Sequence, residues 1–169
     1  YARLKSSHGS MTVIVCYAPT DEADTNRKDN FYGKLQEVIT KVPKRDILIC
    51  IGDMNAKLGN DNDGFSECMG VHGLGEMNDN GVRFASFCLA NELIIGSTLF
   101  EHRDIHKYTW ISPCGKYRNQ IDHLAINRKC KNSLLDVRSR RGADIGSDHQ
   151  LVVSTLRHKL KTRKPTSQI

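Results

Sequence analysis

The sequence predicts a mixed α/β domain, because strand-like and helix-like apolar patterns alternate along it. Residues 11–17 are rich in Val and Ile, which is typical of a strand. Residues 27–42 place apolar side chains three and four positions apart, which predicts an amphipathic helix. Residues 46–51 consist of Asp46 followed by a short, continuous apolar run, which is typical of a strand buried on both faces. The expected fold class is therefore α/β (α+β).

The remaining elements follow in order. Pro43 is expected to end the first helix, and residues 59–75, in which Asn, Asp and Gly recur, are expected to form a long loop. A second helix follows, with Asp79 or Asn80 as its N-cap. One side of this helix would carry Phe84, Phe87, Cys88 and Asn91. Four further strands are expected at residues 93–97, 108–111, 121–126 and 150–156.

Three polar clusters adjoin otherwise apolar, strand-like runs. They are residues 52–55 (Gly-Asp-Met-Asn), 120–123 (Gln-Ile-Asp-His) and 147–149 (Ser-Asp-His). Charged and imidazole groups are costly to hold beside a core unless something pairs with them or uses them. The clusters therefore indicate one assembled site of carboxylates, an amide and a histidine. Such a set suits phosphoryl chemistry that depends on a divalent metal.

Each cluster taken alone also has a simpler interpretation. Asp53 or Asn55 could merely bond the nearby backbone in a turn. Asp122 could be a strand residue paired with a neighbouring Arg, and residues 147–149 could only begin a strand. The order of the clusters and their repeated placement at strand ends favour a site.

The three clusters resemble the successive signatures of the endonuclease/exonuclease/phosphatase superfamily. Within it, residues 15–20 (Val-Cys-Tyr-Ala-Pro-Thr), 53–59 and 108–110 resemble the endonuclease domain of non-LTR retrotransposons. The likeness is nearest to the craniofacial development protein 2 group and extends to about His158. It implies part of a four-layer sandwich, in which two mixed β-sheets are flanked by helices.

The resemblance assigns roles to five residues. It implies that Asp53 and Asn55 position or activate the attacking water and contact the scissile phosphate. It places Asp148 among the ligands of Mg²⁺ (or Mn²⁺), and His149 beside the phosphate, paired with Asp122. A carboxylate bonded to one imidazole nitrogen fixes the tautomer and leaves the other nitrogen free for proton transfer. Whether His149 or Asp53 is the base stays open.

Other residues are weaker candidates. Tyr17 matches a family tyrosine near the phosphate, although a half-buried strand aromatic would look the same. Lys116 and Arg118 are substrate-binding candidates, because basic groups near this segment contact nucleic acid in the family. His123 follows a site residue within its strand, so we expect it to point to the opposite face and to be structural. Trp110 reads as a core residue.

The resemblance also implies that early strands are missing. Family members begin with strands that supply an Asn and a metal-binding Glu, whereas residues 1–11 contain no carboxylate. We expect a domain at residues 1–158 that lacks its N-terminal part, followed by a disordered basic tail at residues 159–169. Such a chain would be a poor or inactive nuclease. The alternative function is a catalytically impaired, domesticated or truncated remnant that binds nucleic acid or a protein partner.

Length and composition fit a single domain. The chain has 169 residues, of which 38% are hydrophobic and 26% charged. It contains no secretion signal and no apolar run near the length of a membrane span, so the expected location is intracellular, with the nucleus a candidate. The six cysteines are widely spaced, which favours a reduced setting.

The net charge of +6 is unevenly distributed. Residues 19–101 hold 8 basic and 14 acidic groups. Residues 102–141 hold 10 basic and 3 acidic groups, and residues 157–169 hold 5 basic groups and no acid. Such basic tracts favour nucleic acid as the partner, DNA first, because Lys and Arg contacts to phosphate supply most non-specific affinity. The expected function is a Mg²⁺-dependent phosphodiesterase, most simply a DNA endonuclease of retrotransposon origin. A sister activity on phospholipid head groups or inositol phosphates is a third interpretation.

Overall fold

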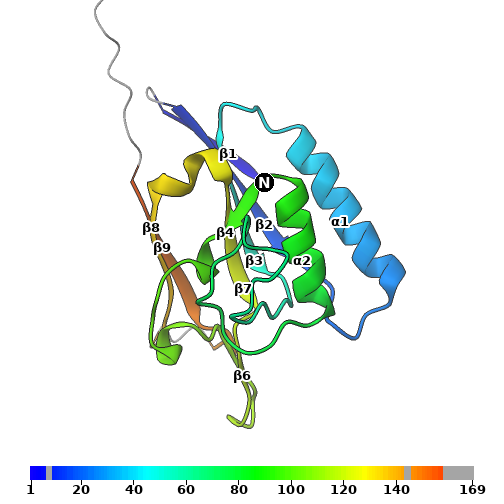
Figure 1. Ribbon diagram of the computed structural model, residues 1–169, viewed down its shortest axis with the longest axis vertical. Coiled ribbons are helices and arrows are strands. Elements are labelled where there is room, and N and C mark those ends of the chain that lie inside the picture. Colours follow the sequence, from blue (N-terminus) through cyan, green and yellow to red (C-terminus); the bar gives the residue numbers. More distant parts are fainter. Residues whose placement is uncertain (7–8, 143–145, 158–169) are drawn as a thin grey trace, which may run out of the picture.

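A five-stranded mixed sheet forms the centre of the protein (Figure 1). The computed structural model describes residues 1–6, 9–142 and 146–157. Strands β2 and β3 run parallel, and the other neighbouring pairs are antiparallel. In spatial order the strands are β1 (Ala2–Ser6), β2 (Gly9–Tyr17), β3 (Ile47–Asp53), β7 (Asp122–Asn127) and β4 (Leu93–Ile95).

The two faces of this sheet are covered differently. Helices α1 (Thr25–Thr40) and α2 (Asp79–Ala90) pack on one face, and their buried Leu35 and Phe84 join Ile14 of β2 in the larger core cluster. Strands β8 (Leu134–Arg140) and β9 (Leu151–Leu156) form an antiparallel pair. Leu134 and Val137 of β8 share a second core cluster with residues of β3, β4 and β7, and Val152 and Leu156 of β9 pack against it. The expected mixed α/β class is confirmed.

Helix α1 confirms the first predicted helix, shifted by two residues. It begins after Asp24, whose carboxylate accepts a hydrogen bond from the backbone N–H of Arg27 at 3.1 Å, and it ends before Pro43. Helix α2 confirms the second, but its predicted N-cap is wrong. The cap is Asn78, whose Oδ1 accepts a hydrogen bond from the N–H of Gly81 at 2.8 Å.

Several short elements complete the described chain. The strand expected at residues 93–97 ends at Ile95 and continues as the 3₁₀ turn η1 (Gly96–Thr98). Residues 59–75 contain no helix or extended strand, as expected for a long loop. The sequence analysis missed three strands, β1, β6 and β8. The other elements are η2 (Asp104–His106), β5 (Trp110–Ile111), β6 (Arg118–Asn119) and η3 (Arg128–Ser133).

The expected end of the domain concerns residues that the structure does not describe. The boundary at residue 158 and the tail at residues 159–169 lie outside them. In the part that is described, none of the helices combines the length and the apolar character that a membrane span would require.

Candidate functional site

A cavity of about 560 Å³ opens where β2 and β3 end and β7 begins. We call it the cleft. Five of the predicted site residues line it, namely Tyr17, Asp53, Asn55, Asp148 and His149. The sixth, Asp122, pairs with Asp53 across β3 and β7 and contacts His149. The structure therefore brings the three polar clusters together, although they lie far apart in the sequence.

Gly52 places Asp53 at the end of β3. Its φ of +136° lies in a region that favours glycine, and a Cβ there would meet the carbonyl oxygen of Cys16 at 2.0 Å. Only glycine therefore allows β2 and β3 to approach so closely at this point. Tyr17 and Asp53 are paired at the ends of these two strands, so both side chains start from the edge of the cleft.

Asn55 turns the chain immediately after β3. Its φ of +47° is left-handed, a conformation that Asn tolerates better than most residues. Its backbone N–H donates to Oδ1 of Asp53 at 2.8 Å, and its Nδ2 donates to the carbonyl oxygen of Ala18 at 2.9 Å. The turn interpretation is thus correct, but it does not exclude the site, because both side chains also line the cleft.

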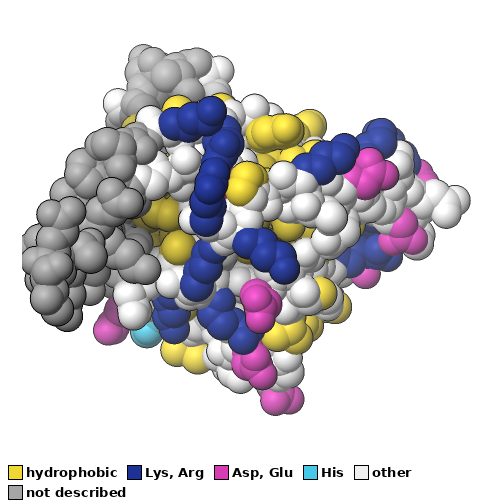
Figure 2. Space-filling model, turned by 90° about the horizontal axis from the view of Figure 1, so that it is seen from above, with side chains coloured by type: hydrophobic (Ala, Val, Ile, Leu, Met, Phe, Trp, Pro, Cys, Tyr) yellow, Lys and Arg dark blue, Asp and Glu magenta, His cyan; other side chains and the backbone are white. Residues whose placement is uncertain are grey.

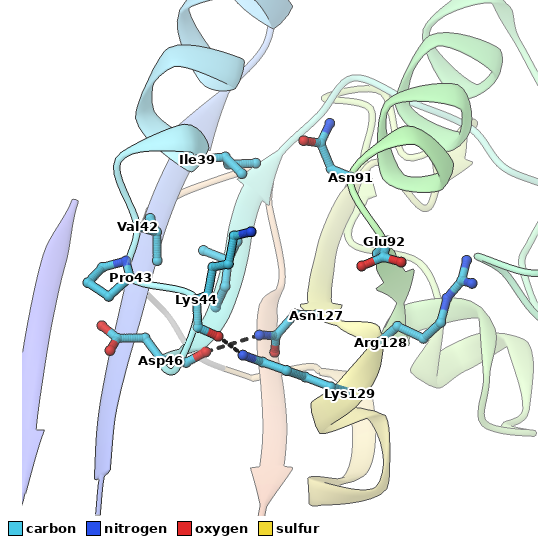
Figure 3. A pocket seen from close by; sticks show the side chains of 11 residues that line it. Ile39, Val42, Pro43, Lys44, Asp46, Asn91, Glu92, Asn127, Arg128 and Lys129 are labelled. Atoms are coloured by element: carbon cyan, nitrogen blue, oxygen red, sulfur yellow. Dashed lines mark hydrogen bonds between the residues drawn. The ribbon is translucent and has the colours of Figure 1, made fainter.

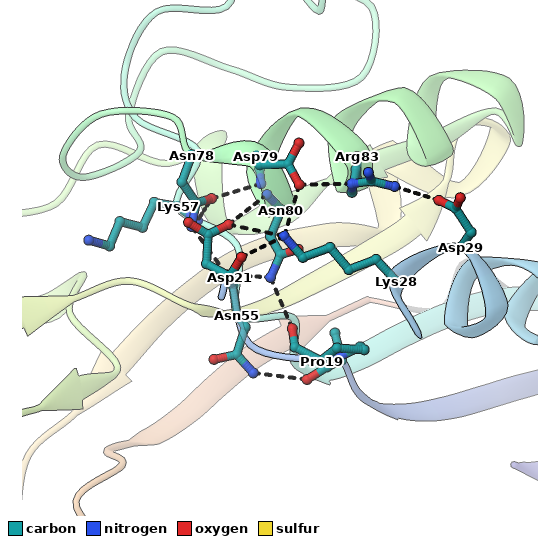
Figure 4. Close-up of polar contacts among 12 residues, drawn as sticks. Pro19, Asp21, Lys28, Asp29, Asn55, Lys57, Asn78, Asp79, Asn80 and Arg83 are labelled. Carbon is teal, nitrogen blue, oxygen red and sulfur yellow. Dashed lines mark hydrogen bonds and ion pairs between the residues drawn. The ribbon is translucent and has the colours of Figure 1, made fainter. Parts of the chain in front are cut away.

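Asn80, which is 2% exposed, ties the loops around the cleft together. Its Nδ2 donates to the carbonyl oxygen of Pro19 at 2.9 Å and to that of Asn55 at 3.1 Å (Figure 4). One side chain in the first turn of α2 therefore holds both the segment after β2 and the segment after β3. Sequence reasoning gave Asn80 only the role of an N-cap and missed this one.

An ion-pair network braces the same region. The ammonium of Lys28, which is buried, donates to Oδ2 of Asp79 at 2.9 Å and to the carbonyl oxygen of Asp21 at 2.6 Å. Arg83 bridges Asp79 and Asp29 at 2.9 and 2.6 Å (Figure 4). These contacts link α1 to the start of α2. The buried position of Lys28 on α1 had no sequence signal, since its acidic partners come from distant segments.

His149 pairs with Asp122 as expected. The distance between Nδ1 of His149 and Oδ2 of Asp122 is 2.9 Å, and both side chains are partly buried. The alternative in which Asp122 pairs with an Arg is not seen among the described residues. A backbone bridge between His149 and Trp110 anchors the histidine, and Thr109 accepts the N–H of Asp122 at 3.0 Å.

Trp110 holds the proposed metal ligand Asp148. Its indole Nε1–H donates to Oδ2 of Asp148 at 2.7 Å, and the backbone N–H of Ile111 donates to the carbonyl oxygen of Asp148 at 3.0 Å. Trp110 is only partly buried and lines the cleft, so its interpretation as a core residue was wrong. No local pattern could have shown this, because the two residues are 38 positions apart.

His123 is structural, as expected. Its ring is 2% exposed and stacks on Phe84, away from the cleft. Its Nε2 lies 2.7 Å from the carbonyl oxygen of Ala56, and its Nδ1 lies 2.6 Å from Oγ of Ser97. Since a carbonyl oxygen only accepts, Nε2 is the donor and the Ser97 hydroxyl donates to Nδ1. Burial lowers the pKa of His123, which keeps the ring neutral.

Of the weaker candidates, Tyr17 lies at the cleft, whereas Lys116 and Arg118 lie outside it. Tyr17 is 77% exposed, so it is not a half-buried strand aromatic, and it lines the cleft. Lys116 and Arg118 do not line the cleft. They lie on the β5–β6 hairpin, where Lys116 packs over the ring of Tyr117 and Arg118 over that of Tyr108. Trp110 and Asn119 of the same hairpin do line the cleft.

The cleft carries an excess of negative charge. Four carboxylates line it, those of Asp21, Glu22, Asp53 and Asp148, against the single ammonium of Lys57. Burial, together with the charges of nearby carboxylates, raises the pKa of Asp53, although a backbone hydrogen bond and His149 oppose the shift. This environment favours a bound cation or a shared proton.

The donor types fit a hard divalent cation, for which carboxylate oxygens are the usual protein ligands. Within the described residues, however, no three His, Cys, Asp or Glu side chains gather closely enough to hold a metal ion. A cation in the cleft would therefore take one or two carboxylates, with water or substrate oxygen completing its shell. That coordination is common for Mg²⁺.

Comparison with known proteins finds similar sequences and similar folds. The chain is 39% identical over 166 residues to craniofacial development protein 2 of Bos taurus, and 38% identical to that of Tragulus javanicus. Over nearly its whole length the chain is similar to craniofacial development protein 2. Each alignment covers 98% of the chain but only 28% and 29% of these relatives, so it spans little more than a quarter of their length. No family model matches the chain.

Similarity to solved structures establishes the fold of the chain. The chain is similar to the endonuclease domain of TRAS1, a telomere-specific non-LTR retrotransposon, with a TM-score of 0.64 and 18% identity over 93% of this chain and 62% of that one. It is also similar to the 3′ phosphatase NExo from Neisseria bound to product DNA hairpin, with a TM-score of 0.62 and 20% identity over 92% and 64%. A third similar structure is an endonuclease/exonuclease/phosphatase family protein from Leptotrichia buccalis, with a TM-score of 0.60 and 14% identity over 92% of this chain and 52% of that one. The fold is therefore that of the endonuclease/exonuclease/phosphatase proteins.

Proposed function

We propose that the cleft hydrolyses phosphodiester bonds of nucleic acid, DNA first, with the help of Mg²⁺ or Mn²⁺. The observation that carries this proposal is the His149–Asp122 pair, held at 2.9 Å in the same cleft as the carboxylates of Asp53 and Asp148. The fold supports it, because both the TRAS1 domain and NExo are described as enzymes of nucleic acid.

Each side chain of the cleft would have a separate role in the hydrolysis. Asp122 accepts the Nδ1–H of His149, which fixes the tautomer and leaves Nε2 to exchange a proton with water or to donate to a phosphate oxygen. Asp53, whose pKa is raised by burial, is suited to orient a water molecule or take its proton. Asn55 is held rigidly beside it and would contact the phosphate. Tyr17 lies exposed at the rim, where substrate would enter.

Asp148 would hold the cation, with water or substrate oxygen completing its shell. A divalent cation supplies stabilisation of the negative charge that develops on the phosphate. The hydrogen bond from Trp110 fixes one oxygen of Asp148, which leaves the other free to bind.

A second candidate function is a module that binds nucleic acid without cleaving it. It is favoured by the lack, in the described part of the chain, of three close acidic, histidine or cysteine side chains. Cation binding in the cleft without any hydrolysis would support this candidate.

Substrate class can be tested with a panel in Mg²⁺ or Mn²⁺. Supercoiled plasmid, single-stranded DNA, an inositol phosphate and bis(p-nitrophenyl) phosphate would each be incubated with the protein and with an EDTA control. We expect cation-dependent nicking of plasmid and slow hydrolysis of the generic diester. Hydrolysis of the inositol phosphate alone would overturn the nucleic-acid assignment.

A further inference from the structure

The end of the sheet opposite to the cleft is strongly basic. Strand β3 contains seven residues, so its two ends lie roughly 20 Å apart. Eight Lys and Arg residues belong to segments at the far end, either in β1, just after α1, just before β3 or in η3. We call this group the basic end: Arg3, Lys5, Lys41, Lys44, Arg45, Arg128, Lys129 and Lys131.

Few acids oppose these charges. Asp46 is paired with Arg3 at 2.6 Å, and Glu67 with Arg128 at 3.1 Å. Lys44 and Arg45 form no ion pair with any acid that the structure describes, and Lys129 donates only to the backbone carbonyl of Lys44. Figure 2 shows a file of Lys and Arg side chains crossing this face, with acidic side chains below the file and at the right of the view.

A hollow of about 400 Å³ lies within the basic end. Lys44 and Lys129 both line it and touch each other, since Nζ of Lys129 contacts the carbonyl oxygen of Lys44, and apolar residues at the end of α1 form one wall (Figure 3). Asn127 also lines it, and its buried Oδ1 has no donor among the described residues. The carboxylates of Asp46 and Glu92 line the hollow too, so the case for an anionic partner depends on the basic side chains around it rather than on the hollow itself.

The chain continues from this end with more positive charge. Arg157, the last described residue, donates its backbone N–H to the carbonyl oxygen of Ser133, the final residue of η3, at 2.7 Å. The sequence that follows contains Lys159, Lys161, Arg163 and Lys164 and no acid.

We infer that the basic end is a second nucleic-acid surface, which binds the phosphate backbone of duplex DNA independently of the cleft. Lys and Arg side chains arranged in a file along a surface match a run of phosphates. A straight duplex seated in the cleft could not also lie across the far end of the sheet. The basic end would therefore hold a different segment of the DNA, or a second molecule.

The test is the salt dependence of duplex binding in EDTA, measured by fluorescence anisotropy. A basic-end variant carrying Lys44→Gln, Arg45→Gln and Lys129→Gln would be compared with a control carrying Arg27→Gln, Lys34→Gln and Arg103→Gln. The control residues are exposed and lie outside the basic end, and the two variants lose equal charge. Thermal unfolding would establish that both are folded.

We expect the basic-end variant to lose about tenfold or more in affinity near 0.1 M salt, and the log–log salt slope to flatten by roughly two to three. The control should change little. Repeating the comparison without residues 159–169 would separate the contribution of the tail. An unchanged slope, or an equal loss in the control, would overturn the inference, as would binding to phosphatidylserine vesicles but not to DNA. Because the assay needs no cleavage, failure of the proposed hydrolysis would leave this result untouched.

Discussion

Oδ2 of Asp122 lies 2.9 Å from Nδ1 of His149, although the two residues are 27 positions apart. Asp122 begins β7 of the central sheet, whereas His149 precedes β9 and is anchored by its bridge to Trp110. The contact therefore joins two separate parts of the fold at the cleft. Because of this contact, residues from two separate sequence motifs can act together in proton transfer.

This pair predicts the tautomer of His149. Because a carboxylate accepts, the neutral ring should carry its proton on Nδ1, with Nε2 unprotonated. Long-range ¹H–¹⁵N correlation spectra of ring-labelled protein would identify the nitrogen that carries the proton. Asp122→Ala should remove the preference, whereas Asp136→Ala, which changes the carboxylate beside His102, should not affect His149. An Nε2–H tautomer in the unmodified protein would contradict the assigned geometry.

Trp110 should report cation binding, since it is the only tryptophan and its indole N–H bonds to Asp148. Titration with Mn²⁺ should quench its fluorescence in a saturable way. Asp148→Asn should weaken the apparent affinity by about tenfold or more, because a charged ligand is lost. Asp63→Asn, an exposed carboxylate in the long loop, is the matched control. Equal quenching in all three proteins would place the cation elsewhere.

Asn80→Ala should destabilise the fold. The substitution leaves the carbonyl oxygens of Pro19 and Asn55 without the donor that they share, at a cost of about 1–3 kcal/mol. Chemical denaturation would measure the loss of unfolding free energy. Asn30→Ala, at an exposed position of α1, should change it by less than about 0.5 kcal/mol. Similar values for the two variants would show that Asn80 does not tie the cleft loops.

Acid should weaken the clamp between β1 and β3. The guanidinium of Arg3, aided by the hydroxyl of Thr12, lowers the pKa of Asp46 to about 2. A carboxylate with a depressed pKa in the folded state stabilises it above its ordinary pKa, and this contribution disappears as the pH falls from about 4 to about 2. Asp46→Asn should therefore lower the unfolding free energy at pH 7, with a smaller difference from the unmodified protein at pH 2. An equal difference at both pH values would exclude this linkage.

The sequence predicted those helices and strands whose apolar residues follow a regular local pattern. The apolar spacing gave α1, and the unbroken apolar run gave β3, because burial on one or both faces leaves a regular pattern in the sequence. The N-cap of α2 was misassigned because three cap-forming residues, Asn78, Asp79 and Asn80, are consecutive. Only the tertiary partners of Asp79 and Asn80 decide which of the three caps the helix.

The site was predictable to the extent that its residues sit in short motifs. Asp53, Asp122 and His149 each follow or precede an apolar run, and the fold brings these strand ends together. Trp110 was misread and Lys28 missed because their roles depend on partners from distant segments. Strand β1 was missed for the same reason, since an exposed strand is defined by the neighbour it pairs with. Strand β8 was missed because charged residues interrupt its apolar pattern, although Leu134 and Val137 are buried.

The most direct test of the proposed function is plasmid nicking in Mn²⁺ with the protein in excess over DNA. Three proteins would be compared: the unmodified chain, His149→Ala, and His102→Ala. The last changes another Asp-paired histidine, outside the cleft, and so controls for the substitution itself. We predict slow nicking that EDTA abolishes, that His149→Ala reduces by about 100-fold or more, and that His102→Ala leaves nearly unchanged. Equal nicking by the unmodified protein and His149→Ala, or none by any of them while Mn²⁺ binds in the cleft, would contradict a hydrolytic role for this site.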